Sequence, residues 1–184
     1  GVHLPVQPME HHYLITETIP LIKDRMETMG EAGRLPAGID YEANIYFRQE
    51  REGMLLGTYE PTGVPWKVDG TPWDFGHELL PDDLDKVEDS IEFAYRRFPV
   101  LATAGVKSVI HGPFTFAPDG NPLVGPVPGF QNYWSACGVM AGFSQAGGVG
   151  LMLAQWMIHG ECERDVTALD VARYGKWITP GYTR

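Results

Sequence analysis

The stretch CGVMAGFSQAGGVG, residues 137–150, is the part of the sequence that decides the fold. Apolar residues at 133–136 before it are typical of a β-strand, and the apolar residues at 151–158 after it are typical of a helix. Small residues between the two allow another group to approach the backbone closely. Free amides and the positive dipole at a helix start favour a negatively charged partner. The stretch therefore predicts a strand, a glycine-rich loop and a helix that contact a bound cofactor.

The rest of the chain reads as strands and turns with one long helix. The helix is expected at 82–98, because acidic residues stand at its start, arginines at its end, and apolar residues recur at helical spacing. Residues rich in β-branched and aromatic side chains predict strands at 13–19, 44–50, 54–60 and 106–113. Regular βαβ spacing is missing, so we expect the α+β class, with a mixed or antiparallel sheet and flanking helices.

Composition limits the classes of partner. The 184 residues carry a formal net charge of -10, which argues against nucleic acid and anionic membranes as partners. No apolar run reaches transmembrane length. The two cysteines, Cys137 and Cys162, form no CxxC pair, and the histidines lack the spacing of metal ligands, so no metal is expected.

Two common site motifs fail on inspection. Residues 148–153 begin like the dinucleotide fingerprint GxGxxG but have no third glycine, and no other stretch matches it. If a dinucleotide binds, residues outside this chain hold its ADP half. Residues 142–146 lack the second glycine of a nucleophile elbow. An alternative interpretation of the turn-rich segment 115–126 is a rigid hairpin without a binding role.

Three segments together carry a family resemblance. They are PMEHHY at 8–13 followed by Thr16 and Glu17, HGPFTFAPDGNPLVG at 111–125, and the glycine-rich segment at 132–151. They resemble the C-terminal part of the FAD module of dimethylglycine and sarcosine dehydrogenases, in the D-amino-acid-oxidase-like superfamily. His111 stands where that family often has asparagine.

The resemblance implies a piece of a larger protein. Residues 1–110 would be part of a substrate-binding domain, and residues 111–165 would be the last strand, loop and helix that complete an FAD-binding domain. Residues 166–184 would begin a linker toward a folate-binding module that uses tetrahydrofolate. Most of the FAD contacts would then come from a missing N-terminal part.

The resemblance also implies an activity and its residues. The expected reaction is oxidative demethylation of an N-methyl amine such as dimethylglycine or sarcosine, by hydride transfer to FAD. The electron acceptor would be a protein such as an electron-transfer flavoprotein, and the location would be cytoplasmic in a bacterium or the mitochondrial matrix in a eukaryote. The family's motifs place the catalytic histidine and tyrosine at His11 and Tyr46. They place the FAD contacts at Gly112, Pro113, Gly138, Ala141, Gly142, Phe143, Ser144, Gln145, Ala146 and Gly147.

Two other readings remain open from the sequence. One is a non-catalytic regulatory homologue, like a phosphatase regulatory subunit that keeps the flavoprotein fold. The other is an interaction domain whose glycine-rich segment only packs a helix on a strand. The presence of both His11 and Tyr46 favours an enzyme.

Overall fold

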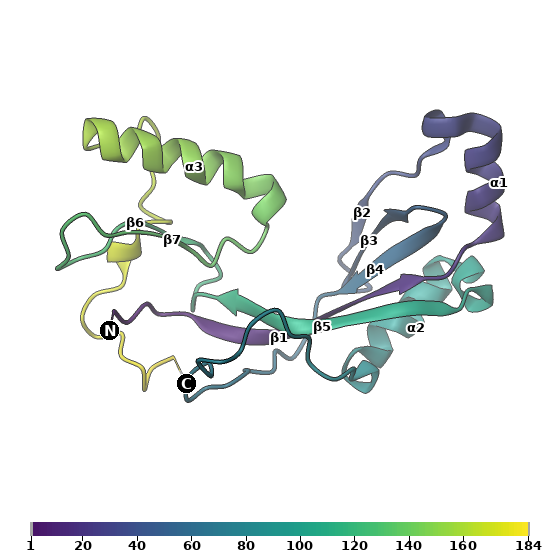
Figure 1. Cartoon of the computed structure of the whole chain (residues 1–184), viewed down its shortest axis with the longest axis horizontal. Helices are drawn as coiled ribbons and strands as arrows, with labels where there is room; N and C mark the ends of the chain where they lie inside the picture. The colour runs from purple at the N-terminus through teal and green to yellow at the C-terminus, as the bar shows by residue number, and fades with distance from the viewer. Residues whose placement is uncertain (1, 184) are drawn as a thin grey trace. The chain divides into compact units, whose positions relative to one another are not determined.

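The computed structural model describes residues 2–183, which form the mixture of strands and helices that the sequence predicts (Figure 1). They divide into two compact units. The sheet unit consists of Glu10–Val64 and Asp74–Pro113. The hairpin unit consists of the described residues up to Met9, Pro65–Trp73, and the described residues from Phe114 onward.

A five-stranded sheet with the order β2-β3-β4-β1-β5 organises the sheet unit. Its pairs β2·β3, β3·β4 and β1·β4 are antiparallel. The expected α+β class is therefore confirmed. The strand bounds are β1 (Gln7–Thr16), β2 (Gly38–Asp40), β3 (Ile45–Glu50), β4 (Gly53–Thr58) and β5 (Val106–Phe116).

The core of this unit lies against one face of the sheet. Side chains alternate between the two faces of a strand, so Leu14, Ile45 and Leu56 point to the same side. They pack with Ile22 of α1 (Pro20–Met29) and Ala94 of α2 (Glu88–Arg97). The opposite face is left with the odd-numbered residues of β1 and the even-numbered residues of β3.

The helix predicted at 82–98 is shorter in the structure than in the prediction. The expected helix at 82–98 is α2, preceded by the 3-10 turn η2 (Leu84–Val87). Val87 has φ -123° and ψ 13°, outside α-helical values, and this residue separates the two segments. Helix α1 and strand β2 lie in residues 20–43, where no element was expected, and the 3-10 turns η1 (Gly30–Gly33) and η3 (Pro99–Thr103) complete the unit.

The hairpin unit is built on β6 (Leu123–Pro126) and β7 (Trp134–Cys137), which pair antiparallel. Helix α3 (Gly142–His159) follows β7, and η4 (Val171–Arg173) lies near the end of the unit. Gly125, with φ +116°, lets the Trp156 ring of α3 rest on the hairpin, because a Cβ there would lie 2.7 Å from the ring. Arg173 binds both carboxylate oxygens of Asp119 at 2.8 and 2.9 Å and fastens the turn before β6.

The glycine-rich stretch differs from the expected loop. Helix α3 begins at Gly142 and not near Leu151, so the segment 142–147 forms its first turns and only residues 138–141 form a loop. Glycine is a poor helix former, by about 1 kcal/mol relative to alanine, but this preference is weak and tertiary context overrides it. Gly138 alone in this segment has a positive φ, +66°.

Candidate active site

The face of the sheet opposite the core, called the open face below, carries both residues expected to be catalytic. His11 lies on β1 and Tyr46 on β3, and β4 runs between these two strands. Tyr46 pairs with Gly57 of β4, and Gly57 in turn pairs with Tyr13 of β1. Because the side-chain period of a strand is two, His11, Tyr46 and Gly57 share this face.

Gly57 allows the two side chains to meet. A Cβ placed on Gly57 would lie 1.8 Å from Cζ of Tyr46, so the ring crosses β4 directly over this residue. The tyrosine hydroxyl thereby reaches the imidazole on the far strand, with Tyr46 Oη 3.1 Å from His11 Nε2. Sequence reasoning missed Gly57, although a glycine inside an apolar strand is a known sign of close approach.

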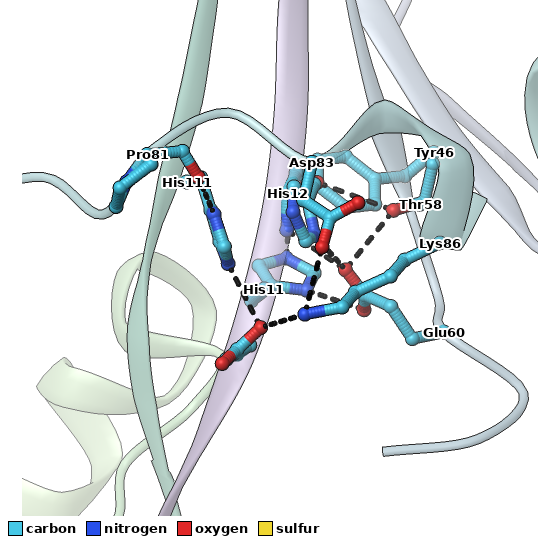
Figure 2. A network of polar contacts seen from close by, with 10 residues as sticks. His11, His12, Tyr46, Thr58, Glu60, Pro81, Asp83, Lys86 and His111 are labelled. Atoms are coloured by element: carbon cyan, nitrogen blue, oxygen red, sulfur yellow. Dashed lines mark hydrogen bonds and ion pairs between the residues drawn. The ribbon is translucent and has the colours of Figure 1, made fainter. Parts of the chain in front are cut away.

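Glu60 completes a network around His11 (Figure 2). It lies just beyond β4, and its Oε2 is 2.8 Å from His11 Nδ1. Its other oxygen, Oε1, accepts hydrogen bonds from the backbone N–H of His12 at 2.8 Å and from the Thr58 hydroxyl at 3.2 Å. Oε1 also lies 3.2 Å from His12 Nδ1. No motif in the sequence pointed to Glu60.

The charges of the neighbours define the hydrogen bonds of His11. Burial raises the pKa of Glu60, but hydrogen bonds and the charge of His11 outweigh burial and bring this pKa down to about 2. Burial raises the pKa of Tyr46 to about 12, and the Glu60 charge acts in the same direction. At neutral pH Glu60 is therefore an acceptor and Tyr46 keeps its proton. His11 accordingly donates from Nδ1 to Glu60, and its Nε2 faces the Tyr46 hydroxyl.

A second polar cluster lies on the core side of β1. His12 is 1% exposed and stacks on His111 with ring centroids 3.7 Å apart. Burial lowers the pKa of His12, so this ring is neutral at neutral pH. His111 Nδ1 donates to the Pro81 carbonyl at 2.5 Å. Its Nε2 lies 3.2 Å from Glu10, which also binds Lys86 at 2.6 Å (Figure 2).

The residues expected to contact FAD fall in both units. Gly112 and Pro113 lie on β5 and belong to the sheet unit. The others lie in the hairpin unit: Gly138 follows β7, Ala141 is the N-cap position of α3, and Gly142, Phe143, Ser144, Gln145, Ala146 and Gly147 form the start of the helix.

The start of α3 is uncapped and lies next to unfilled space. No side chain caps it, so its first amides are free of a capping partner of that kind. A Cβ placed on Gly142 or Gly147 would find no atom within 4 Å among the described residues, and the Phe143 side chain is fully exposed. The chain thus leaves open space beside the helix start, together with amides that suit an anionic group.

Three further findings concern chemistry that the described residues do not carry. Among residues 2–183, no three His, Cys, Asp or Glu side chains are grouped so that they could hold a metal ion. Within the same residues, no helix has the length and apolar character needed to cross a membrane. Cys137 and Cys162 are both free thiols.

The fold is shared with solved structures that include a glycine oxidase from Geobacillus kaustophilus. The structure is similar to L-proline dehydrogenase from P.horikoshii, with a TM-score of 0.70 and 20% sequence identity, over 94% of this chain and 41% of that chain. The chain belongs to the DAO family of FAD dependent oxidoreductases, whose family model matches residues 1–156.

Curated relatives narrow the comparison. Mitochondrial dimethylglycine dehydrogenase of Mus musculus is 42% identical over 188 residues, which cover 100% of this chain and 21% of the relative. Mitochondrial sarcosine dehydrogenase of Mus musculus is 33% identical, over 97% of this chain and 18% of the relative. The mitochondrial pyruvate dehydrogenase phosphatase regulatory subunit of Mus musculus is 31% identical, over 94% and 19%. The chain thus spans about a fifth of the length of these relatives.

Proposed function

We propose that this chain is part of a flavoprotein that oxidatively demethylates an N-methyl amine such as dimethylglycine or sarcosine. The observation that carries the proposal is the hydrogen-bonded series Tyr46–His11–Glu60 on the open face of the sheet. It presents an imidazole next to a tyrosine hydroxyl, which is a suitable arrangement for proton transfer from a substrate ammonium. The similarity to dimethylglycine and sarcosine dehydrogenases supports this substrate class.

The residues at the start of α3 fit an FAD contact. The open space at Gly142 and Gly147 admits a flat group close to the backbone, and the uncapped helix start favours negative charge on it. We assign the same role to Gly138, to residues 141–147, and to Gly112 and Pro113 on β5. Bound there, FAD would supply the hydride acceptor of the reaction.

His11 acts on the substrate nitrogen in this proposal. An amine gives up a hydride from its methyl carbon only when the nitrogen lone pair is free to form the C=N bond of the iminium product. Nε2 of His11 takes the ammonium proton and frees that lone pair. Glu60 stabilises the imidazolium that results, and Tyr46 holds the ring on its other side.

We further propose the roles of the three segments of the chain that the resemblance implies. Residues 1–110 contribute to substrate binding, residues 111–165 complete the FAD site, and residues 166–184 lead toward a folate-binding module. Tetrahydrofolate would then receive the carbon that the substrate loses, and an electron-transfer flavoprotein would reoxidise the flavin. Two of the relatives are named as mitochondrial dehydrogenases, which supports the mitochondrial matrix as the location in a eukaryote, with the cytoplasm as its bacterial counterpart.

Anaerobic titration of the complete protein tests the proposal. The purified protein should be yellow, and dimethylglycine or sarcosine should bleach its visible flavin absorbance. The regulatory alternative, favoured by the similarity to the phosphatase regulatory subunit, predicts that neither amine bleaches the flavin. Absence of a flavin, or a flavin that no N-methyl amine reduces, would refute the enzymatic proposal.

A further inference from the structure

Glu60 connects the two faces of the sheet. Its side chain is 12% exposed, and its two oxygens point to different partners. Oε2 serves His11 on the open face. Oε1 serves His12 and Thr58, whose side chains belong to the core face. The carboxylate of Glu60 is therefore held by residues of the core face and hydrogen-bonds His11 on the open face.

The direction of each hydrogen bond follows from the charge of this carboxylate. An ionised carboxylate only accepts, so every partner must present a hydrogen to it. The His12 backbone and the Thr58 hydroxyl do so at Oε1. His11 must do so from Nδ1 at Oε2, which leaves Nε2 as the nitrogen of His11 that can take up a proton.

We propose that Glu60 is the positioning residue of this site: it fixes the Nδ1–H tautomer and the ring orientation of His11, while His12 and Thr58 hold the carboxylate in place. This inference rests on the proposed function for its catalytic consequence. The geometric part, that Glu60 determines which nitrogen of His11 is protonated, holds independently of the substrate. Glu60 itself does not touch the substrate.

The network explains why an amide cannot replace the carboxylate. In Glu60→Gln, one of the two terminal atoms becomes an NH₂ group that can only donate. Placed toward His11, this group faces the Nδ1–H, and placed toward the core it faces the His12 backbone N–H. Either orientation sets two donors against each other. The histidine then loses its preferred tautomer or the side chain loses its anchor.

The test compares Glu60→Gln with Glu60→Asp in the complete flavoprotein. A matched control is Glu31→Gln, which removes the same charge from an exposed side chain. Anaerobic reduction of the flavin by dimethylglycine is followed in single turnover from pH 6 to 10. Glu60→Gln should lower the plateau rate about 10- to 100-fold, the range expected for loss of a hydrogen bond to a charged group. The control should stay within about twofold of wild type.

The pH profile separates positioning from general damage. Glu60 and Tyr46 both lie within hydrogen-bond distance of the His11 ring, and Glu60 carries a negative charge at neutral pH. Loss of that negative charge makes a protonated ring less stable, so the acid limb of the rate should move to lower pH in Glu60→Gln. Glu60→Asp keeps the charge, so it should slow the reaction while leaving the acid limb near its wild-type position. Equal profiles for the two variants, or no change in either, would overturn the proposal.

A second measurement needs no substrate. Diethyl pyrocarbonate modifies unprotonated imidazole nitrogens, and peptide mapping reports the modification of His11 separately from that of the buried His12. Modification of His11 should persist to lower pH in Glu60→Gln than in wild type and Glu31→Gln. If no N-methyl amine reduces the wild-type flavin, the proposed function fails, and this shift alone decides for or against Glu60. If Glu60→Gln does not fold, an Asp variant that reduces at the wild-type rate would refute the positioning role.

Discussion

Gly57 gives the sharpest prediction, because its missing side chain makes room for the ring of Tyr46. In Gly57→Ala the new methyl group would overlap the Tyr46 ring, whose Cζ lies 1.8 Å from the position of the Cβ. Ordinary contact needs 3.4 Å or more, so the ring must swing away from β4. Its hydrogen bond of 3.1 Å to His11 Nε2 is then lost. The backbone itself need not move, because only the far part of a side chain obstructs the methyl group.

The expected effect can be stated as a rate. A hydrogen bond of this kind contributes about 1 kcal/mol net, which corresponds to about a fivefold lower rate of flavin reduction. The displaced ring also loses its packing over β4, so the melting temperature of the complete protein should fall, since overpacking typically costs about 1–3 kcal/mol. Stopped-flow reduction under anaerobic conditions and thermal unfolding measure the two effects.

A double-mutant cycle with Tyr46→Ala tests the mechanism of this loss. Alanine at position 46 removes the ring that the methyl group displaces, so Gly57→Ala should change the rate by less than about twofold in that background. An equal loss in both backgrounds would show that Gly57 acts through something other than Tyr46. A wild-type rate in Gly57→Ala alone would refute the reasoning outright.

The remaining predictions concern three other contacts. Tyr46→Phe keeps the ring and loses only the hydroxyl, so flavin reduction should slow about fivefold while flavin content stays at the wild-type level. Gly142→Val should leave the melting temperature of the isolated chain nearly unchanged, since a Cβ there meets no described atom, but should lower the flavin content of the complete protein. Arg173→Ala should destabilise the protein by about 2 kcal/mol at pH 7, whereas the exposed pair of Arg96 with Glu92 should contribute little in Arg96→Ala. The Arg173 guanidinium holds the pKa of Asp119 well below its usual range. The stability from this pair is therefore present above about pH 4 and lost in acid, and thermal melts should show the Arg173→Ala deficit shrinking as the pH falls below that value.

The sheet was predictable where a turn signal separates two strand-like runs. β3 and β4 were expected at 44–50 and 54–60 and lie at Ile45–Glu50 and Gly53–Thr58, because a short turn separates two runs that each contain several apolar residues. Helix α1 was missed, since Pro20 opens it and Ile22 is its only buried residue, so its apolar period is weak. The start of α3 was misplaced because glycines conceal a helix whose stability comes from contacts and not from propensity.

Only some residues of the candidate active site were predicted from the sequence. His11 and Tyr46 were named from family motifs, and their roles remain proposals. Gly57 was missed and Glu60 could not be named, because their importance arises from strand register and from side chains 35 to 49 positions apart in the sequence meeting in space. A pattern along one strand does not encode which residue lies opposite on the next. The glycine within β4 was the one local signal available.

The most direct test of the central claim is the pH dependence of anaerobic flavin reduction in His11→Ala. If Nε2 of His11 takes the substrate proton, the variant should retain its FAD but reduce about 10²- to 10⁴-fold more slowly than wild type at neutral pH. The difference should shrink as the pH rises, because solvent then deprotonates the amine without help. A rate equal to wild type at neutral pH, in a variant that still binds FAD, would remove His11 from the mechanism and contradict the account.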